Sequence, residues 1–143
     1  MPLFLNVQMK KIYIAPIVFI LLYCAAPVFA DDFQDGLDAA GRGDFTTAFE
    51  KWEPLARRGN ALAQFNLGLM YDKGEGVKRN YSKALRWYTL AAKQGIASAQ
   101  FNLGALYSKG KGVRQSFKKA RMFYNRAAKQ GNVSAQFNLG LMY

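Results

Sequence analysis

The side chains that most often carry out catalysis are scarce in this chain. It contains no histidine and a single cysteine, Cys24. Histidine is the usual general base near neutral pH, and histidine and cysteine are common ligands of transition metals. The serines have no obvious activating base and are expected at helix caps or surfaces: Ser82, Ser98, Ser108, Ser116 and Ser134. We therefore expect no catalytic, cofactor-binding or metal-binding residues and no enzyme activity.

Two segments, Gly74-Glu75-Gly76 and Gly110-Lys111-Gly112, contain glycines spaced as in some phosphate-binding loops. A nucleotide fingerprint needs a strand before the glycines and a helix that opens directly from them. Here a helix is expected before each segment, and further residues separate the glycines from the next helix cap. We interpret both segments as structural turns that Val77 and Val113 anchor to the body of the protein.

Acidic side chains gather just after residue 30. Carboxylate oxygens are the ligands that calcium prefers, but a charge cluster of this kind is more often a solvated face. We expect a solvated face rather than a calcium site from this set: Asp31, Asp32, Asp35 and Asp38.

Charge is unevenly distributed along the chain. Residues 31–75 carry 5 basic and 9 acidic side chains, a net charge of −4, whereas residues 76–143 carry 13 basic side chains and no acid. Such an excess should attract anionic partners such as an envelope polymer or lipid. The alternative is that the cations only solvate outer helices and complement helix dipoles at Lys93 and Lys129. The cations expected on loops and on one helix are Lys78, Arg79, Lys109, Lys111, Arg114, Lys118, Lys119, Arg121 and Arg126.

The first 30 residues have the order of a secretory signal peptide. Basic residues at Met9-Lys10-Lys11 precede the apolar run 12–26, and Val28-Phe29-Ala30 offers a cleavage site before the acids. A retained membrane anchor is the alternative, but a span needs about 20 apolar residues, and this run is shorter. We expect cleavage after Ala30, with Met9 as an attractive true start.

Export determines what the processed chain can contain. Cys24 would leave with the signal peptide, and the bulky Tyr23 before it argues against lipidation. The processed chain would have no cysteine and no disulfide. We expect a periplasmic or secreted protein, and this location disfavours nucleic acid as a partner.

An internal repeat sets the architecture. The segment 63–71 (AQFNLGLMY) recurs at 99–107 (AQFNLGALY) and at 135–143 (AQFNLGLMY), with a step of 36 residues. Repeats of this length are typical of solenoid proteins. The positions that keep the step and that we expect to maintain the fold are Leu67, Gly68, Tyr71, Ala84, Tyr88, Gly95, Leu103, Gly104, Tyr107, Ala120, Tyr124 and Gly131.

Each unit is predicted to form two helices. Apolar residues recur every three or four positions in both halves of the unit, which is helical spacing. Asp44, Asn80 and Ser116 are predicted N-caps of the second helices, and Asn60 and Asn132 of the first helices, where Ile96 breaks the pattern. Positive-φ glycines are expected to end the second helices at Gly59, Gly95 and Gly131.

Glycine also recurs inside the first helices, at positions 68, 104 and 140. Glycine within a helix costs about 1 kcal/mol relative to alanine. Its recurrence predicts that another helix backbone passes too close for a methyl group. Ala84 and Ala120 are the expected facing residues.

These motifs resemble a known family. Gln-x-x-Leu-Gly-x-x-Tyr resembles the first helix of the tetratricopeptide repeat, with Gln64, Gln100 and Gln136 where that family often has tryptophan. The 36-residue step, the AQFNLG core and the Gly-x-Gly-Val loop resemble the Sel-one-like repeat. The resemblance implies an all-α solenoid, a right-handed superhelix of about seven helices. The expected divisions are a signal peptide (1–30), a divergent helix pair or cap (31–59), two repeats (60–95 and 96–131) and a partial repeat (132–143).

By analogy with the tetratricopeptide repeat, partners would bind the inner face formed by the first helices. Asn66 and Asn102 could hold a peptide backbone or tie down neighbouring helices, and Phe65 and Phe101 could be contact or packing residues. The expected inner-face residues are Leu62, Phe65, Asn66, Leu69, Asp72, Ser98, Phe101, Asn102, Ala105 and Ser108.

The last predicted helix ends the sequence at Tyr143 without a second helix, so Phe137, Leu141 and Met142 should be poorly covered. The sequence is truncated, the tail self-associates, or this helix is the final cap. The leading functional hypothesis is an exported scaffold for a protein or peptide partner. An envelope polyanion or cell-wall ligand binder is the alternative. A β-lactam-binding or hydrolysing protein is a remote third, because the cysteines of such relatives are missing.

Overall fold

The computed structural model describes residues 31–142, and the predicted signal peptide (1–30) and Tyr143 lie outside this range. All regular secondary structure in it is helical, which confirms the all-α solenoid of about seven helices. Residues 31–41 form a helix, followed by α2 (Phe45–Arg57), α3 (Ala61–Lys73), α4 (Tyr81–Lys93), α5 (Ala97–Lys109), α6 (Phe117–Lys129) and α7 (Val133–Gly140).

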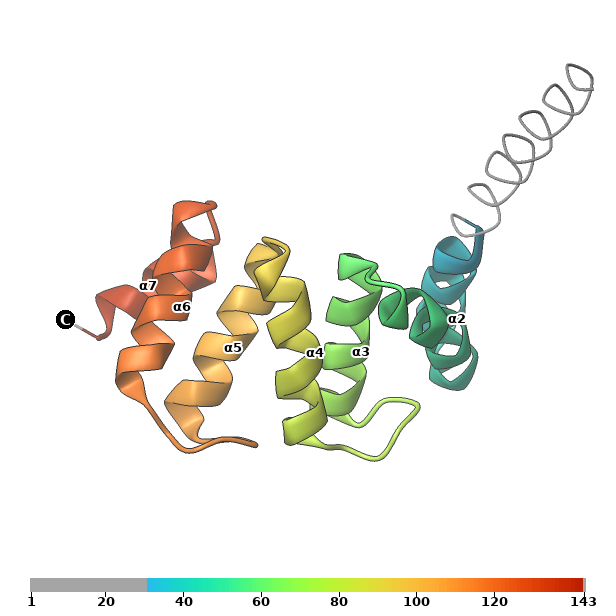
Figure 1. The fold of residues 1–143 in the computed structure, drawn as a ribbon, viewed down its shortest axis with the longest axis horizontal. Coiled ribbons are helices and arrows are strands. Elements are labelled where there is room, and N and C mark those ends of the chain that lie inside the picture. The colour runs from blue at the N-terminus through green and yellow to red at the C-terminus, as the bar shows by residue number, and fades with distance from the viewer. Residues whose placement is uncertain (1–30, 143) are drawn as a thin grey trace, which may run out of the picture.

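The helices pack in chain order. Each pair of consecutive helices from α2 to α7 is in contact, and Figure 1 shows them side by side in one row. The two long loops, after α3 and after α5, lie on the same edge of that row. Neighbour-to-neighbour stacking of this kind is what defines a solenoid. Within residues 31–142 no helix is long and apolar enough to cross a bilayer.

The helix starts follow the predicted caps. The side chains of Asp44, Asn80 and Ser116 each accept a hydrogen bond from the backbone N–H three residues later. Asn60 and Asn132 do the same at the first helices, whereas α5 begins at Ala97 after Ile96, which provides no side-chain cap. Capping oxygens satisfy N–H groups that have no partner within the helix.

The second helices end at the predicted glycines. Gly59, Gly95 and Gly131 have φ of 98°, 92° and 84°. This is the left-handed region that glycine enters without a Cβ penalty. The predicted positive-φ glycines after the second helices are therefore confirmed.

The glycine-rich loops dock onto the preceding unit. A Cβ at Gly112, whose φ is 67°, would lie 2.5 Å from the carbonyl carbon of Tyr81. The Ser82 hydroxyl also donates a hydrogen bond to the Gly112 carbonyl, at 3.4 Å. At Gly76 the corresponding Cβ would lie 2.6 Å from the Phe45 carbonyl oxygen. Each loop therefore joins successive units by close backbone approach, in keeping with a structural turn.

The prediction that a facing helix backbone requires the in-helix glycines is wrong. A Cβ at Gly68 would lie 2.4 Å from the ring of Tyr88, and one at Gly104 would lie 2.6 Å from the ring of Tyr124. Neither the backbone of the facing helix nor the alanines Ala84 and Ala120 impose the restriction. An aromatic ring crosses each first helix and occupies the space that a side chain would need.

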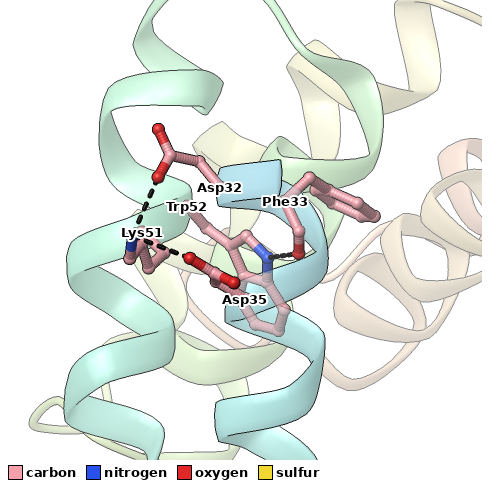
Figure 2. Close-up of polar contacts among 5 residues, drawn as sticks. All are labelled: Asp32, Phe33, Asp35, Lys51 and Trp52. Atoms are coloured by element: carbon pink, nitrogen blue, oxygen red, sulfur yellow. Dashed lines mark hydrogen bonds and ion pairs between the residues drawn. The ribbon is translucent and has the colours of Figure 1, made fainter. Parts of the chain in front are cut away.

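The N-terminal helix pair repeats this arrangement with different residues. A Cβ at Gly36 would lie 2.3 Å from Trp52, and the Trp52 indole N–H donates to the carbonyl of Phe33 at 3.2 Å (Figure 2). Trp52 thus occupies the place that Tyr88 and Tyr124 occupy later. Trp52 stands 36 residues before Tyr88, so the repeat step extends to this helix pair.

The acidic cluster serves the same helix pair. Lys51 Nζ lies 2.8 Å from Asp32 Oδ1 and 3.0 Å from Asp35 Oδ2 (Figure 2). Hydrogen bonds to the two carboxylates raise the pKa of Lys51 to about 12. Gln34 donates to Asp38 at 2.9 Å. The cluster is therefore more than a solvated face, because two of its acids hold α2 against the first helix.

The last helix departs from the expected length. α7 ends at Gly140, while the earlier first helices, α3 and α5, have 13 residues each. Phe137 and Leu141 are 67% and 71% exposed, as expected for a poorly covered face. Met142 differs from that expectation, since it is half-buried against the core around Tyr124. An apolar face with little cover gives the final turn little packing energy.

Candidate functional site

The predicted inner-face residues differ in exposure. Leu62 is 50% exposed and Ser98 is exposed, and both stand in the first turns of their helices. Phe65 and Phe101 are half-buried beside Tyr88 and Tyr124, with ring centroids 6.0 Å and 5.6 Å apart. Each phenylalanine therefore packs against a core tyrosine and keeps part of its ring accessible.

Asp72 and Asn102 hold a core tyrosine. The Tyr88 hydroxyl donates to Asp72 Oδ2 at 3.1 Å. Burial raises the pKa of Tyr88, the nearby Asp72 carboxylate raises it further, and a hydrogen bond with Asn102 opposes the shift. Asn102 therefore interacts with Tyr88 on a neighbouring helix, and its peptide-binding role stays a prediction.

The next unit builds the same arrangement from other side chains. Burial raises the pKa of Tyr124, and hydrogen bonds with Asn138 and Ser108 oppose the shift. Ser108 stands one repeat after Asp72, and Asn138 one repeat after Asn102. The second tyrosine is therefore held by neutral groups, and this end of the inner face lacks the carboxylate of the first unit.

A hollow of about 390 Å³ lies between α5 and α7. We call it the inner hollow. It brings together three of the predicted residues, Phe101, Ala105 and Ser108. Its other lining residues were missed by the sequence analysis: Lys109, Tyr124, Asn138, Leu141 and Met142.

The size of one residue explains why the hollow occurs in this unit. The position of Ala105 is filled by Leu69 in the preceding unit, and Leu69 is partly buried against the core of α4 and α5. Leu69 and Asn66 instead line a smaller hollow of about 130 Å³ beside Trp52. The predicted inner face is thus divided, and its larger cavity lies where alanine replaces leucine.

The inner hollow combines apolar walls with a few polar groups. Phe101, Leu141 and Met142 offer apolar contact, while Ser108 and Asn138 supply hydroxyl and amide groups. A serine hydroxyl and an asparagine amide each form more than one hydrogen bond, so a tyrosine contact leaves further capacity. This composition suits an apolar side chain together with a neighbouring peptide group.

A pair of glutamines within each unit links that unit to a backbone carbonyl of the preceding one, and this role was missed. Gln64, 4% exposed, donates to the carbonyl of Ala56 at 3.0 Å and accepts from Gln94 Nε2 at 2.9 Å. Gln100 and Gln130 make the corresponding pair at 2.9 Å. The signal was present in the sequence, because Gln94 and Gln130 keep the 36-residue step.

The basic side chains after Glu75 form no ion pair with any residue in the range 31–142. Several of the later cations lie over aromatic rings instead, as Lys119 does over Tyr107 at 5.1 Å. The outer side of α6 carries the densest group, around a shallow depression of about 730 Å³. It is lined by Ser116, Lys118, Lys119, Arg121, Met122, Asn125, Arg126 and Lys129.

No group of three or more potential metal ligands occurs among the described residues. The buried polar atoms of the described side chains all have hydrogen-bond partners. The inner hollow is therefore the strongest candidate site, and its chemistry is that of contact and hydrogen bonding.

Solved structures resemble the chain over most of its length. The crystal structure of a Sel1 repeat protein from Oxalobacter formigenes is 34% identical, with a TM-score of 0.74, over 77% of this chain and 45% of that chain. A protective antigen of uropathogenic Escherichia coli strains that displays an SLR fold is 36% identical, with a TM-score of 0.78, over 83% of this chain and 26% of that one.

Curated relatives match a shorter stretch. DAP3-binding cell death enhancer 1 from Mus musculus is 40% identical over 50 residues, which is 35% of this chain and 10% of that protein. The protein of the same name from Rattus norvegicus matches to the same extent. This chain thus spans a tenth of the curated relatives and less than half of the two structures.

A family model described as the Sel1 repeat matches residues 61–96, 97–132 and 133–143, which together make up more than half of the chain. The stacked helices and the two structural neighbours agree with this match. The chain therefore belongs to the Sel1 repeat family.

Proposed function

We propose that this protein is an exported scaffold, periplasmic or secreted, whose inner face binds a segment of a protein partner. The inner hollow carries the proposal, because the partly exposed ring of Phe101 lies there beside Ser108 and Asn138, which can form further hydrogen bonds. An apolar side chain of the partner enters between Phe101 and Leu141. Ser108 and Asn138 bind the adjoining peptide group.

Membership of the Sel1 repeat family supports a scaffold that binds other proteins. The order of residues 1–30 supports export, since a basic start, an apolar run and a cleavage motif follow one another. N-terminal sequencing of the protein recovered from periplasm tests this part. Asp31 is the expected first residue. An intact N-terminus on membrane-bound protein would instead indicate that residues 1–30 remain as a membrane anchor.

Ala105→Leu tests the binding part. The change should fill the inner hollow as Leu69 fills the equivalent space one unit earlier, so the fold has a precedent for it. We expect the variant to lose the crosslinked partner that the unmodified protein captures from periplasm. The matched control is Leu69→Ala, which alters the equivalent position outside the hollow. If Ala105→Leu captured the partner as well as the unmodified protein does, the inner hollow would not be part of the binding site.

A second candidate is binding to an anionic envelope polymer or lipid. The observation that favours it is the group of α6 cations without ion pairs among the described residues. Anionic lipid vesicles provide the probe. Binding to phosphates weakens steeply with salt, whereas contact in an apolar hollow does not. Steep salt dependence that is lost in Lys118→Gln/Arg121→Gln would favour this candidate over the peptide site.

A further inference from the structure

A second hollow lies between the second helices of two successive units. It has a volume of about 240 Å³ and shares no residue with the inner hollow. We call it the outer hollow. Its walls come from α2, α3 and α4: Glu53, Arg57, Tyr71, Lys83, Arg86, Trp87 and Leu90.

The aromatic packing beside this space differs between successive units. Tyr71 meets Phe49 edge-on, with centroids 6.0 Å apart and an interplanar angle of 86°. One repeat later, Tyr107 stacks on Phe123 at 5.6 Å and 11°, and Phe123 stands where Trp87 stands in the earlier unit. Because Tyr71 turns toward Phe49, Trp87 is left beside a gap. The corresponding face of α6 carries the depression lined by Lys119, Met122 and Arg126, so what differs between the two units is the aromatic packing and the charge beside the space.

The hollow carries an excess of positive charge. Arg57 pairs with Glu53 at 2.8 Å, which leaves the charges of Lys83 and Arg86 unbalanced. Lys83 Nζ lies 5.1 Å from the centre of the Tyr71 ring. Arg86 is exposed and forms no ion pair with any residue in the range 31–142. Its repeat counterpart is Met122, so this cation belongs to this unit alone.

The size and chemistry of the hollow identify the class of ligand. Small-molecule sites usually occupy about 300–1,000 Å³, so this hollow suits one or two side chains rather than a complete cofactor. Trp87 and Leu90 offer apolar surface, and Leu90 is 43% exposed. The planar guanidinium of Arg86 matches the geometry of a carboxylate.

We propose that the outer hollow is a second binding site, independent of the inner face, for an acidic segment of a protein partner. An aromatic side chain of that segment packs between Trp87 and Leu90. A neighbouring Asp or Glu carboxylate pairs with Arg86 and Lys83. Pairing of an aromatic with an acidic residue distinguishes this segment from a purely anionic polymer.

The test uses the processed protein and three capped peptides: Gly-Glu-Phe-Gly, Gly-Gln-Phe-Gly and Gly-Glu-Ala-Gly. The indole N–H signal of Trp87 in an NMR spectrum reports on the outer hollow, because Trp87 lines it. The signal of Trp52, which is buried, serves as the internal reference. We expect the Glu-Phe peptide to shift the Trp87 signal. It should bind at least about threefold more tightly than the Gln-Phe peptide, as for one exposed ion pair. It should also bind at least about threefold more tightly than the Glu-Ala peptide, which lacks the aromatic ring.

Arg86→Gln should weaken binding of the Glu-Phe peptide by a similar factor and leave the affinity for the Gln-Phe peptide unchanged. Arg121→Gln is the matched control, because it removes the same charge from α6. Ala105→Leu should leave this binding intact, which separates it from the inner-face proposal. Equal affinity for the Glu-Phe and Gln-Phe peptides, an unmoved Trp87 signal, or an equal loss in Arg121→Gln would overturn the assignment.

Discussion

At the scale of single residues, an aromatic ring crosses the first helix of three units at a glycine, and α7 is the exception. The same contact joins Gly36 to Trp52, Gly68 to Tyr88 and Gly104 to Tyr124. Glycine is less favourable than alanine in a helix by about 1 kcal/mol. Packing of a large ring outweighs this cost, which explains why the glycine recurs.

We predict that Gly104→Ala destabilises the protein. The added Cβ would lie 2.6 Å from the ring of Tyr124, and the ring is buried, so it has little room to retreat. Overpacking of this kind typically costs about 1–3 kcal/mol. Chemical denaturation measures the change. Gly140→Ala is the control, since nothing lies within 4 Å of that position, and a higher melting temperature for Gly104→Ala would contradict the ring contact.

Ionisation of the buried tyrosines should limit stability in alkali. The pKa of Tyr88 is raised above its ordinary value of 10.0 by burial and by Asp72. A raised pKa stabilises the fold fully below the unfolded value and loses this contribution as pH rises through the folded value. We predict a fall in the free energy of unfolding above pH 10.0 that is smaller in Tyr88→Phe.

Denaturant titrations at several pH values would measure the fall. The raised pKa of Lys51 acts in the same direction, so part of the fall should remain in Tyr88→Phe. Lys51→Met provides the complementary variant. An unfolding free energy with the same pH dependence in Tyr88→Phe and in the parent would contradict the role of Tyr88.

At the scale of helices and loops, two devices join successive units. Glutamine pairs bridge the ends of neighbouring helices, as Gln94 does to Gln64. The glycine-rich loops dock on the first turn of the preceding second helix. The same glutamines donate to backbone carbonyls of the preceding unit, Gln64 to Ala56 and Gln94 to Gly59. Both devices therefore reach the backbone of the preceding unit, so they fix the register of stacking without requiring a large apolar core.

Gly112→Ala should therefore weaken the contact between units. The change adds a Cβ 2.5 Å from the carbonyl carbon of Tyr81 at a residue whose φ is 67°. Backbone cannot move aside as a flexible side chain can, so we expect a loss of about 2–4 kcal/mol from overpacking and left-handed strain combined. Gly95→Ala isolates the strain, because its φ is 92° and nothing lies within 4 Å. Equal losses in the two variants would show that the loop contact contributes nothing.

At the scale of the whole molecule, the solenoid is unevenly covered and unevenly charged. The N-terminal end carries the acids and its Trp52 contact, while the C-terminal end carries unpaired cations and α7. Local stability in such an array follows the number of neighbours of each helix. α5 packs on both α4 and α6, whereas α7 packs on α6.

We predict that amide hydrogens exchange faster in α7 than in α5. The exposed Phe137 and Leu141 show how little of α7 is covered. Hydrogen-exchange mass spectrometry measures the difference at low protein concentration. Size-exclusion chromatography over a range of concentrations is the companion measurement. Protection of α7 equal to that of α5, together with a larger species, would show that self-association covers this face.

Features that depend on one helix or one turn could be predicted from the sequence. The 36-residue step, the all-α class, the caps at Asp44 and Asn80 and the glycine at position 95 follow from local spacing and backbone preference. Each of these features needs only neighbouring residues, so a pattern in the chain is enough to predict it.

Contacts between side chains of different helices became known from the three-dimensional structure. It placed Tyr124 rather than Ala120 against Gly104, used Asn102 to hold Tyr88, and opened the inner hollow where Ala105 replaces leucine. These contacts depend on ring orientation and on the register between helices, which a single repeat pattern leaves open. The same reason applies to the outer hollow, since the aromatic packing beside it depends on the direction in which Tyr71 turns.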